Sequence, residues 1–249
     1  RRDAGPGGGE VLAVRGVRWI RRNQVLAAAI GAGLALAGTL TALWVASILH
    51  ARELAILSRR FGEQVSTIER IHEMSMMMPL HDTYQEHPQI RERMRWIRHE
   101  MDRLGEIAAG PGHYALGCGS MALDDWDGAR SHFEAALRAD PNDAASHFNL
   151  GVALSEIYRL RRTEALSSGD KFEQESRLRQ YRREIAEPAL RHIRLGVEAA
   201  GGDRDYGEAL IAKHELDYDR AIRLAATSWK NKPLYYPAGI LQGWSYLDR

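Results

Sequence analysis

The chain has 249 residues, of which 45% are hydrophobic and 27% are charged, the composition of an ordinary globular protein. Its formal net charge of +1 gives no basis for nucleic-acid binding, and its single cysteine, Cys118, excludes an intrachain disulfide. The chain starts at Arg1 rather than at a methionine, so we expect it to be a piece of a longer protein.

The N-terminal part predicts a linker followed by a membrane anchor. Residues 1–24 begin with RRDAGPGGGE, whose glycines and proline indicate a flexible juxtamembrane linker. Residues 25–49 contain no charged side chain and are long enough to cross a bilayer as one helix. The apolar core of a secretory signal peptide is only about 7–15 residues long, so this segment is predicted to be a transmembrane helix. A buried helix of a globular protein is the alternative.

The charges that flank residues 25–49 predict an orientation. Basic residues favour the cytoplasmic side of a membrane, and they are more numerous before this segment than after it. We therefore expect the N-terminus in the cytoplasm and the long C-terminal part outside it. The N-terminal flank carries Arg15, Arg18, Arg21 and Arg22, and the C-terminal flank carries Arg52, Arg59 and Arg60.

Small residues recur along one face of the predicted transmembrane helix. Such stripes let two helices approach closely in lipid, so this face predicts a homodimer. The alternative is that alanine and glycine are simply abundant in this segment. The face consists of Ala27, Gly31, Ala35, Gly38, Ala42 and Ala46.

Residues 50–110 are predicted to be a helical stalk and a linker. Apolar residues at heptad spacing continue the helix and favour a short coiled coil. Pro79 is expected to end this helix near Met78, and Pro88 to open the next one. The heptad positions are Leu54, Leu57, Phe61, Gln64, Ile68, Ile71, Ser75 and Met78, and the next helix has its buried stripe at Ile90, Met94, Ile97, Met101 and Leu104.

The stretch HEMSMMMPLHD at the end of the stalk combines thioethers with His72 and His81. Soft sulfur ligands of this kind suit Cu(I), so a copper site is one interpretation. A methionine-rich helix end that fills irregular packing gaps is the other, and we expect no metal site in this chain.

Residues 111–143 carry the first copy of a recurring pattern. Gly117 and Ala129 are small where two antiparallel helices must approach closely, and Phe133 fills the space between them. The pattern comprises Leu116, Gly117, Ala129, Phe133, Ala136 and Pro141. This stretch resembles a tetratricopeptide repeat (TPR), a helix–turn–helix unit of 34 residues.

The pattern returns at the spacing that stacked repeats require. Leu150 and Gly151 lie 34 residues after Leu116 and Gly117 and begin a second repeat over residues 144–201. The charged stretch at 159–188 is an insertion, expected to form a helical hairpin or arm. A third repeat covers 202–235, and a fourth begins in 236–249. The sequence thus predicts an all-α protein, with a single transmembrane helix followed by an α-solenoid of TPR repeats over 111–249.

The TPR resemblance implies a concave face lined by the first helix of each repeat. Aromatic and apolar side chains there would hold a protein or peptide ligand. The alternative is that several of them only pack between neighbouring repeats, and Cys118 is expected to be a small buried residue. One column is Tyr114, Phe148, Tyr206 and Ile240, and the other is Cys118, Val152, Leu210 and Trp244.

Motifs for catalysis and for cofactor binding are missing from the sequence. It has no nucleotide-binding loop, no H-E-x-x-H, no G-x-S-x-G and no paired-cysteine metal motif. We therefore expect no catalytic residue and no cofactor in this chain.

The order of linker, arginine-flanked anchor, PLHDT and GPGHYALGCGSMAL before the repeats resembles the C-terminal half of membrane-bound bacterial serine/threonine protein kinases. The resemblance implies a sensor and interaction region in the bacterial inner membrane, with its repeats outside the cytoplasm. ATP and Mg²⁺ would belong only to a kinase domain upstream of Arg1. An anchored TPR scaffold or assembly factor for cell-envelope proteins, with no kinase, is the alternative.

Overall fold

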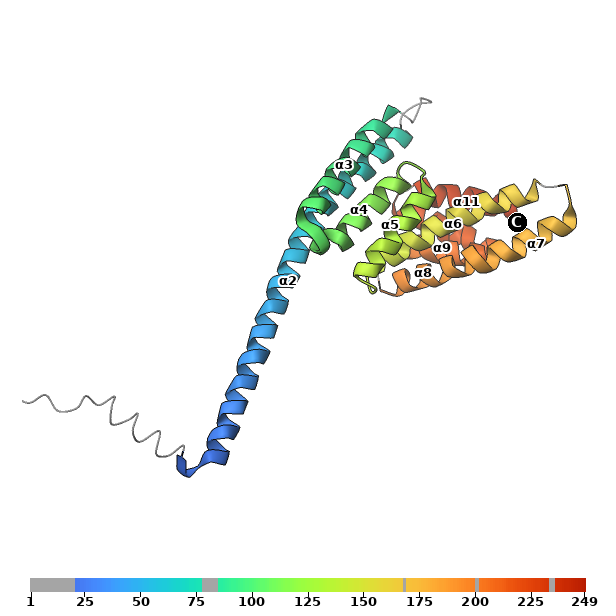
Figure 1. Ribbon diagram of the computed structural model, residues 1–249. Coiled ribbons are helices and arrows are strands. Elements are labelled where there is room, and N and C mark those ends of the chain that lie inside the picture. Colours follow the sequence, from blue (N-terminus) through green and yellow to red (C-terminus); the bar gives the residue numbers. More distant parts are fainter. Residues whose placement is uncertain (1–20, 78–84, 168, 200–201, 233–235) are drawn as a thin grey trace, which may run out of the picture. The chain divides into compact units, whose positions relative to one another are not determined.

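The computed structural model describes residues 21–77, 85–167, 169–199, 202–232 and 236–249, and the regular elements within them are all helical (Figure 1). The chain divides into two compact units, Arg1–Glu53 and Leu54–Arg249, and α2 (Gln24–Met77) contributes residues to both. The other described helices belong to the second unit. The predicted all-α fold class is confirmed.

In the first unit, α2 carries the apolar segment predicted at residues 25–49. By length and composition, it is the one helix in the described part of the chain that could cross a membrane. Its large side chains are open to the surroundings, with Val25 86% and Leu34 70% exposed. The hydroxyls of Thr39 and Thr41 donate to backbone carbonyls one turn earlier, each over 2.8 Å, so both polar groups are satisfied within the helix.

The small-residue face of α2 is also exposed. Neither Gly31 nor Gly38 has an atom of another part of the chain within 4 Å of the position a Cβ would take. Ala35, Ala42 and Ala46 are exposed as well, while the side chain of Ala27 lies outside the described residues. The pairing of two copies through this face stays a prediction.

In the second unit, the stalk part of α2 packs against α3 (His87–Leu104) of the same chain. The expected coiled coil is therefore wrong for the middle of its seam, because Leu57, Phe61 and Ile68 already pack within this chain; Met78, at its end, lies outside the described residues. Phe61 meets the ring of Trp96 edge-on at 6.3 Å, and Arg93 donates to the Gln64 side chain over 3.3 Å. The shared core contains Leu57, Phe61, Val65, Ile68, Ile90, Met94 and Ile97.

The start and end of α3 agree with its sequence. Pro88 lies in its first turn, and Gly105 ends it with a positive φ of 70°. A residue with a Cβ adopts that φ less readily than glycine does. The short helix η2 (Gly105–Ala108) then leads into the first helix of the repeat region.

Seven further helices form a stack in which consecutive members pack on one another (Figure 1). They make three hairpins, α4–α5, α6–α8 and α9–α10, followed by the single helix α11. Their bounds are α4 Ala109–Met121, α5 Trp126–Ala139, α6 Ala144–Leu166, α8 Glu187–Glu198, α9 Arg204–His214, α10 Tyr218–Asn231 and α11 Tyr236–Asp248.

The insertion lies between α6 and α8. It lengthens α6 and adds α7 (Lys171–Tyr181), which packs along α6 and runs through a π-helical turn, η3 (Arg182–Ala186), into α8. Figure 1 shows the α6 and α7 ends reaching past the neighbouring hairpins. The insertion is thus a helical hairpin extension, as its charged sequence predicts.

Aspartates start the repeat helices. The Asp125 carboxylate accepts a hydrogen bond from the Gly128 backbone N–H over 3.0 Å, and Asp217 does the same for Arg220. An N-cap of this kind satisfies one of the free N–H groups at a helix start and is typically worth about 1 kcal/mol. Asp143 and Asp203 cap α6 and α9 in the same way.

Small residues allow the two helices of a hairpin to touch. A Cβ at Gly117 would lie 2.6 Å from the Phe133 ring, and a Cβ at Gly151 would lie 2.5 Å from Ile193 Cγ1. Phe133 and Ile193 are both fully buried. The close approach proposed from the sequence for Gly117 and Phe133 is therefore confirmed, and the second hairpin repeats it with an isoleucine.

Candidate functional site

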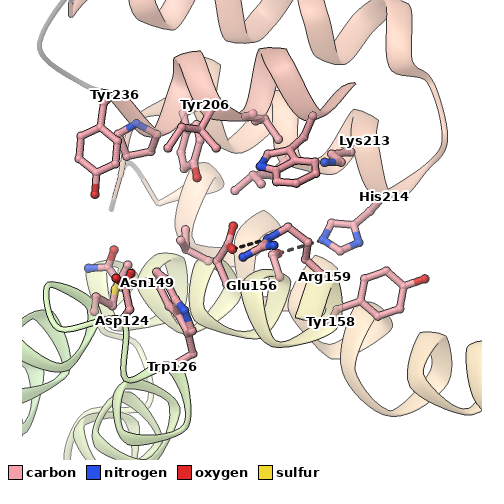
Figure 2. Close-up of a pocket in the computed structure, with 18 of the residues that line it drawn as sticks. Asp124, Trp126, Asn149, Glu156, Tyr158, Arg159, Tyr206, Lys213, His214 and Tyr236 are labelled. Atoms are coloured by element: carbon pink, nitrogen blue, oxygen red, sulfur yellow. Dashed lines mark hydrogen bonds and ion pairs between the residues drawn. The ribbon is translucent and has the colours of Figure 1, made fainter. Parts of the chain in front are cut away.

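A pocket of about 1010 Å³ opens on the side of the stack formed by the first helices of the hairpins. Its walls come from α4, α6, α9 and α11, from the turn that precedes α5, from η3 and α8, and from the end of α2. Figure 2 shows Asp124, Trp126 and Tyr236 on one side of it, and Lys213 and His214 on the other. A mixture of aromatic, apolar and charged side chains therefore faces one space, as in protein sites that hold ligands.

Six of the eight residues predicted for the concave face line this pocket. They come from four different helices, and two of them, Ile240 and Trp244 on α11, remain 50% and 41% exposed. The six are Cys118, Val152, Tyr206, Leu210, Ile240 and Trp244.

The other two predicted residues, Tyr114 and Phe148, do not line the pocket. The ring of Tyr114 packs on Phe133, with 5.9 Å between centroids, and its hydroxyl accepts a hydrogen bond from Asn149. Phe148 is 4% exposed and packs beside Tyr206. Both join neighbouring helices, which was the alternative left open for some of these positions.

Cys118 lies at the pocket wall but is 8% exposed. Burial raises the pKa of its thiol to about 12, so it stays protonated at neutral pH. A thiol is a poor nucleophile in that form. The side chain acts here as a small apolar residue, in accord with the expectation from the sequence.

One end of the pocket is rich in cations. Arg159 and Lys213 approach the face of the Trp244 ring, at 5.4 and 6.0 Å from its centroid. Arg159 pairs with Glu156 over 2.7 Å, and Asp248 binds Arg162 over 2.9 Å and Lys213 over 3.4 Å. Desolvation alone would raise the pKa of Asp248, but its hydrogen bonds and these charges lower it. The carboxylate therefore stays ionised and holds α11 against α6 and α9.

The other end is acidic and involves α2. Glu69 and Glu73 of α2 and Asp124 of the α4–α5 turn line the pocket there. His72 hydrogen-bonds to the hydroxyl of Tyr236 on α11, with 5.4 Å between ring centroids. Partial removal from water lowers the pKa of His72, although the Asp124 charge opposes this shift.

Ser155 and His214 form the arrangement in the pocket that most resembles a catalytic pair. Their Oγ and Nε2 atoms are 2.9 Å apart, but the Ser155 hydroxyl donates its hydrogen to the Gly151 carbonyl over 2.8 Å. His214 must then supply the hydrogen from Nε2, which leaves that nitrogen unable to accept the serine proton. Burial and the Lys213 and Arg182 charges lower the pKa of His214 to about 4. The pair therefore links α6 to α9.

Within the described residues, three or more His, Cys, Asp or Glu side chains do not gather into a group that could hold a metal ion. Of the residues considered for copper, Met78 and His81 lie outside the described part of the chain.

The sequence did not indicate the contribution of α2 to the pocket. Four residues of α2 line the pocket: Glu69, His72, Glu73 and Met76. In the sequence they alternate with the heptad residues, so they suggest the exposed side of a stalk. Their spacing along one face of the helix was the available signal, since residues three or four apart lie together.

Comparison with known proteins addresses the first hairpin. The family model of the tetratricopeptide repeat matches residues 110–143, while no curated protein and no solved structure matches the chain. Residues 110–143 form a TPR. The match covers α4 and α5, together with the Asp125 cap and the contact between Gly117 and Phe133. TPR units are protein-interaction modules, and the pocket lies where the first helices of successive hairpins meet.

Proposed function

We propose that the second unit binds an extended segment of another protein in the pocket between α4, α6, α9 and α11. The observation that carries this proposal is the convergence of six predicted ligand-facing residues, from four helices, on one space of about 1010 Å³. Trp244 and Ile240 offer exposed apolar surface there, and such anchors dominate binding energy at protein interfaces.

Selection from a phage-displayed random peptide library tests this proposal. The bait is the full 249-residue chain in lipid nanodiscs, with empty nanodiscs used to remove non-specific phage. Peptides enriched by the wild type should bind Trp244→Ala at least about tenfold more weakly, because a central aromatic anchor is lost. Phe172→Ala is the matched control, since Phe172 is 76% exposed on α7 and does not line the pocket. Equal binding to both variants would contradict the proposal.

We also propose that α2 anchors the chain in the inner membrane of a bacterium, with the N-terminus in the cytoplasm and the repeats outside. The apolar composition of residues 25–49 and the excess of arginine before them support this. Alkaline phosphatase fused after Arg249 should be active, and a fluorescent protein that matures only in the cytoplasm should be dark at the same point. The reverse pattern would invert the topology.

The parent protein, we propose, is a membrane-bound serine/threonine kinase of which this chain is the sensing part. Support comes from the resemblance of the linker-to-repeat region, and ATP and Mg²⁺ would bind only in the upstream domain. The coding sequence upstream of Arg1 tests it directly. Kinase motifs there, such as a glycine-rich loop, H-R-D and D-F-G, are the expected result. A start codon at that place would leave the envelope scaffold as the function.

Homodimerisation through the small-residue face of α2 is part of the same proposal. A transmembrane two-hybrid reporter should carry residues 15–53, because Leu57 and Phe61 belong to the core of the second unit. Gly31→Ile together with Gly38→Ile should lower association, since isoleucine holds the two helices apart. Gly33→Ile, on the opposite side of the helix, is the control. Equal signals from the wild type, the double variant and the control would show that this face does not pair the helices and reflects only the abundance of alanine and glycine.

A further inference from the structure

The wall that α2 contributes to the pocket carries a strong charge of one sign. Glu69 and Glu73 lie one turn apart on α2, and Asp124 faces the same space from the α4–α5 turn. Within the described residues, none of these three carboxylates makes an ion pair or a side-chain hydrogen bond. Partial removal from water, followed by the nearby Glu73 charge, raises the pKa of Glu69.

The opposite end of the pocket has the opposite sign but is largely neutralised from within. Arg159 is paired with Glu156, and Asp248 is shared by Arg162 and Lys213. Arg182 adds a further cation at that end. A ligand with a basic side chain is therefore attracted towards the carboxylates beside α2, which are unpaired among the described residues, rather than to the other end, and this difference sets the direction in which it lies.

Contacts between α2 and α11 complete the pocket at the acidic end. His72 and Tyr236 join the two helices, and Met76 of α2 and Ile240 of α11 add apolar surface around them. Side chains from α2, α11 and the α4–α5 turn thus border this end of the pocket, where a charge pair with a ligand is less screened than on a flat surface.

We propose that the peptide bound in this pocket lies directly against α2 and places a lysine or arginine side chain between Glu69, Glu73 and Asp124. The inference rests on the proposed peptide-binding function and adds to it the chemistry of the ligand and the part of the chain that recognises it. The ligand then contacts the same helix that carries the apolar segment 25–49.

The selection described above also supplies the first test. Peptides enriched on the nanodisc-bound chain should share a lysine or arginine at a fixed distance from an aromatic or aliphatic residue. Enriched peptides without such a basic position would overturn this inference and leave the proposed function standing. If no peptide is enriched over empty nanodiscs, the proposed function itself fails, and this inference fails with it.

Charge removal on α2 gives the second test, with a synthetic peptide from the selection as the probe. Glu69→Gln together with Glu73→Gln should weaken binding about tenfold or more, because the basic side chain loses its partners in a partly enclosed site. Glu63→Gln is the matched control on the same helix, since Glu63 does not line the pocket. Unchanged binding by the double variant, with an unchanged circular dichroism melting curve, would overturn the inference.

Photo-cross-linking gives a readout that does not depend on a substitution in the protein. A benzophenone group placed next to the basic residue of the peptide should label the tryptic fragment 71–91, which contains His72 and Met76. Labelling confined to fragments of α6, α9 or α11 would show that the peptide lies elsewhere in the pocket, and the inference would be wrong.

Discussion

The hairpins α4–α5 and α6–α8 share their packing but differ in how their helices are joined. Residues 122–125 connect α4 to α5, whereas 167–186, including α7 and η3, connect α6 to α8. Both hairpins nevertheless put a glycine against a large buried side chain, Phe133 in one and Ile193 in the other. The contact at the base of the hairpin therefore defines the unit, and the connection can vary as long as it leaves that contact intact.

Each of the two hairpins also contains a histidine pair that bridges its two helices. His113 and His132 approach to 3.2 Å between Nδ1 atoms, and His147 and His192 approach to 2.8 Å. His113 and His147 are 34 residues apart, as are the two glycines, so the pairs occupy equivalent positions. Because His147 Nε2 also faces the Pro141 carbonyl over 3.0 Å, its neutral form leaves Nδ1 free to accept from His192.

The largest difference in stability between the two hairpins is expected when each glycine is replaced by alanine. Gly151→Ala should lower the free energy of unfolding by about 2–3 kcal/mol, and Gly117→Ala by about 1–2 kcal/mol. The new Cβ at 151 meets backbone atoms of Ile193 and Ala189 within 3.0 Å, whereas the three atoms nearest to the Cβ at 117 all belong to the Phe133 ring. Urea unfolding of the full chain, followed by circular dichroism, measures both values.

A second substitution in each variant separates a clash with a side chain from a clash with the backbone. Phe133→Leu should recover part of the stability lost in Gly117→Ala, because it removes ring atoms that the new Cβ meets. Ile193→Val should recover little of the stability lost in Gly151→Ala, because it leaves the backbone atoms in place. Gly243→Ala is the control, since no atom lies within 4 Å of its added Cβ. Equal losses and equal recoveries would mean that the hairpins tolerate crowding in the same way.

Acid should lower the stability of both hairpins, and we expect this loss of stability to be the next largest effect. Partial burial lowers the pKa of His113, His132 and His192 below the ordinary value near 6.5, with help from nearby cations and from the paired ring. Their neutral forms are therefore favoured in the folded state, and the free energy of unfolding should fall as pH drops from 7 through 6.5 towards the folded pKa values.

Unfolding curves of His132→Gln and His192→Gln across that pH range measure how much each histidine pair contributes to the pH dependence of stability. Each variant should show a weaker pH dependence than the wild type. His72 and His214, whose pKa values are also lowered by burial, should supply much of what remains. A wild-type stability that rises on acidification would contradict the expected sign.

A smaller gain in stability is expected at Ser146. Its hydroxyl is fully buried and has no hydrogen-bond partner among the described residues, while the equivalent position in the first hairpin is Gly112. Ser146→Ala should raise the free energy of unfolding by about 1 kcal/mol, because an unsatisfied buried hydroxyl is removed. Ser245→Ala is the control: that buried hydroxyl donates to the Leu241 carbonyl over 2.7 Å, so its removal should bring no gain.

The smallest effect is expected at the far end of the insertion. Phe172 is 76% exposed on α7, so Phe172→Ser should change the free energy of unfolding by less than about 0.5 kcal/mol. Thermal melts of this variant and the wild type should then superimpose. A loss comparable to that of Gly117→Ala would show that the insertion contributes to the base of the α6–α8 hairpin.

Periodicity predicts the helices of this protein well because it reports local geometry. The stripe from Ile90 to Leu104 marked α3, and Gly117 with Phe133 marked the hairpin contact that the structure contains. The same reasoning failed for the partner of the stalk. Heptad spacing shows that Phe61 and Ile68 need a partner, but it cannot distinguish a second chain from α3 of the same chain.

The pocket was predicted only in part for a related reason. The concave columns follow from the repeat spacing, and six of those residues do line the pocket. The contact between His72 and Tyr236 joins positions 164 residues apart, so it depends on the curvature of the whole stack. Tyr114 and Phe148 lie at the predicted positions along their helices, but neighbouring helices cover them.

The unequal connections of the two hairpins have a consequence for the order of folding. Gly117 and Phe133 are separated by 133 − 117 = 16 positions, and Gly151 and Ile193 by 193 − 151 = 42. Closing the longer loop costs about 0.9 kcal/mol more chain entropy before any contact forms. Chains with shorter sequence separation between contacts reach their transition state sooner, so the α4–α5 hairpin should act as the nucleus on which α6 and α8 assemble. Substitutions at Phe133 should then slow refolding, while those at Ile193 should mainly speed unfolding.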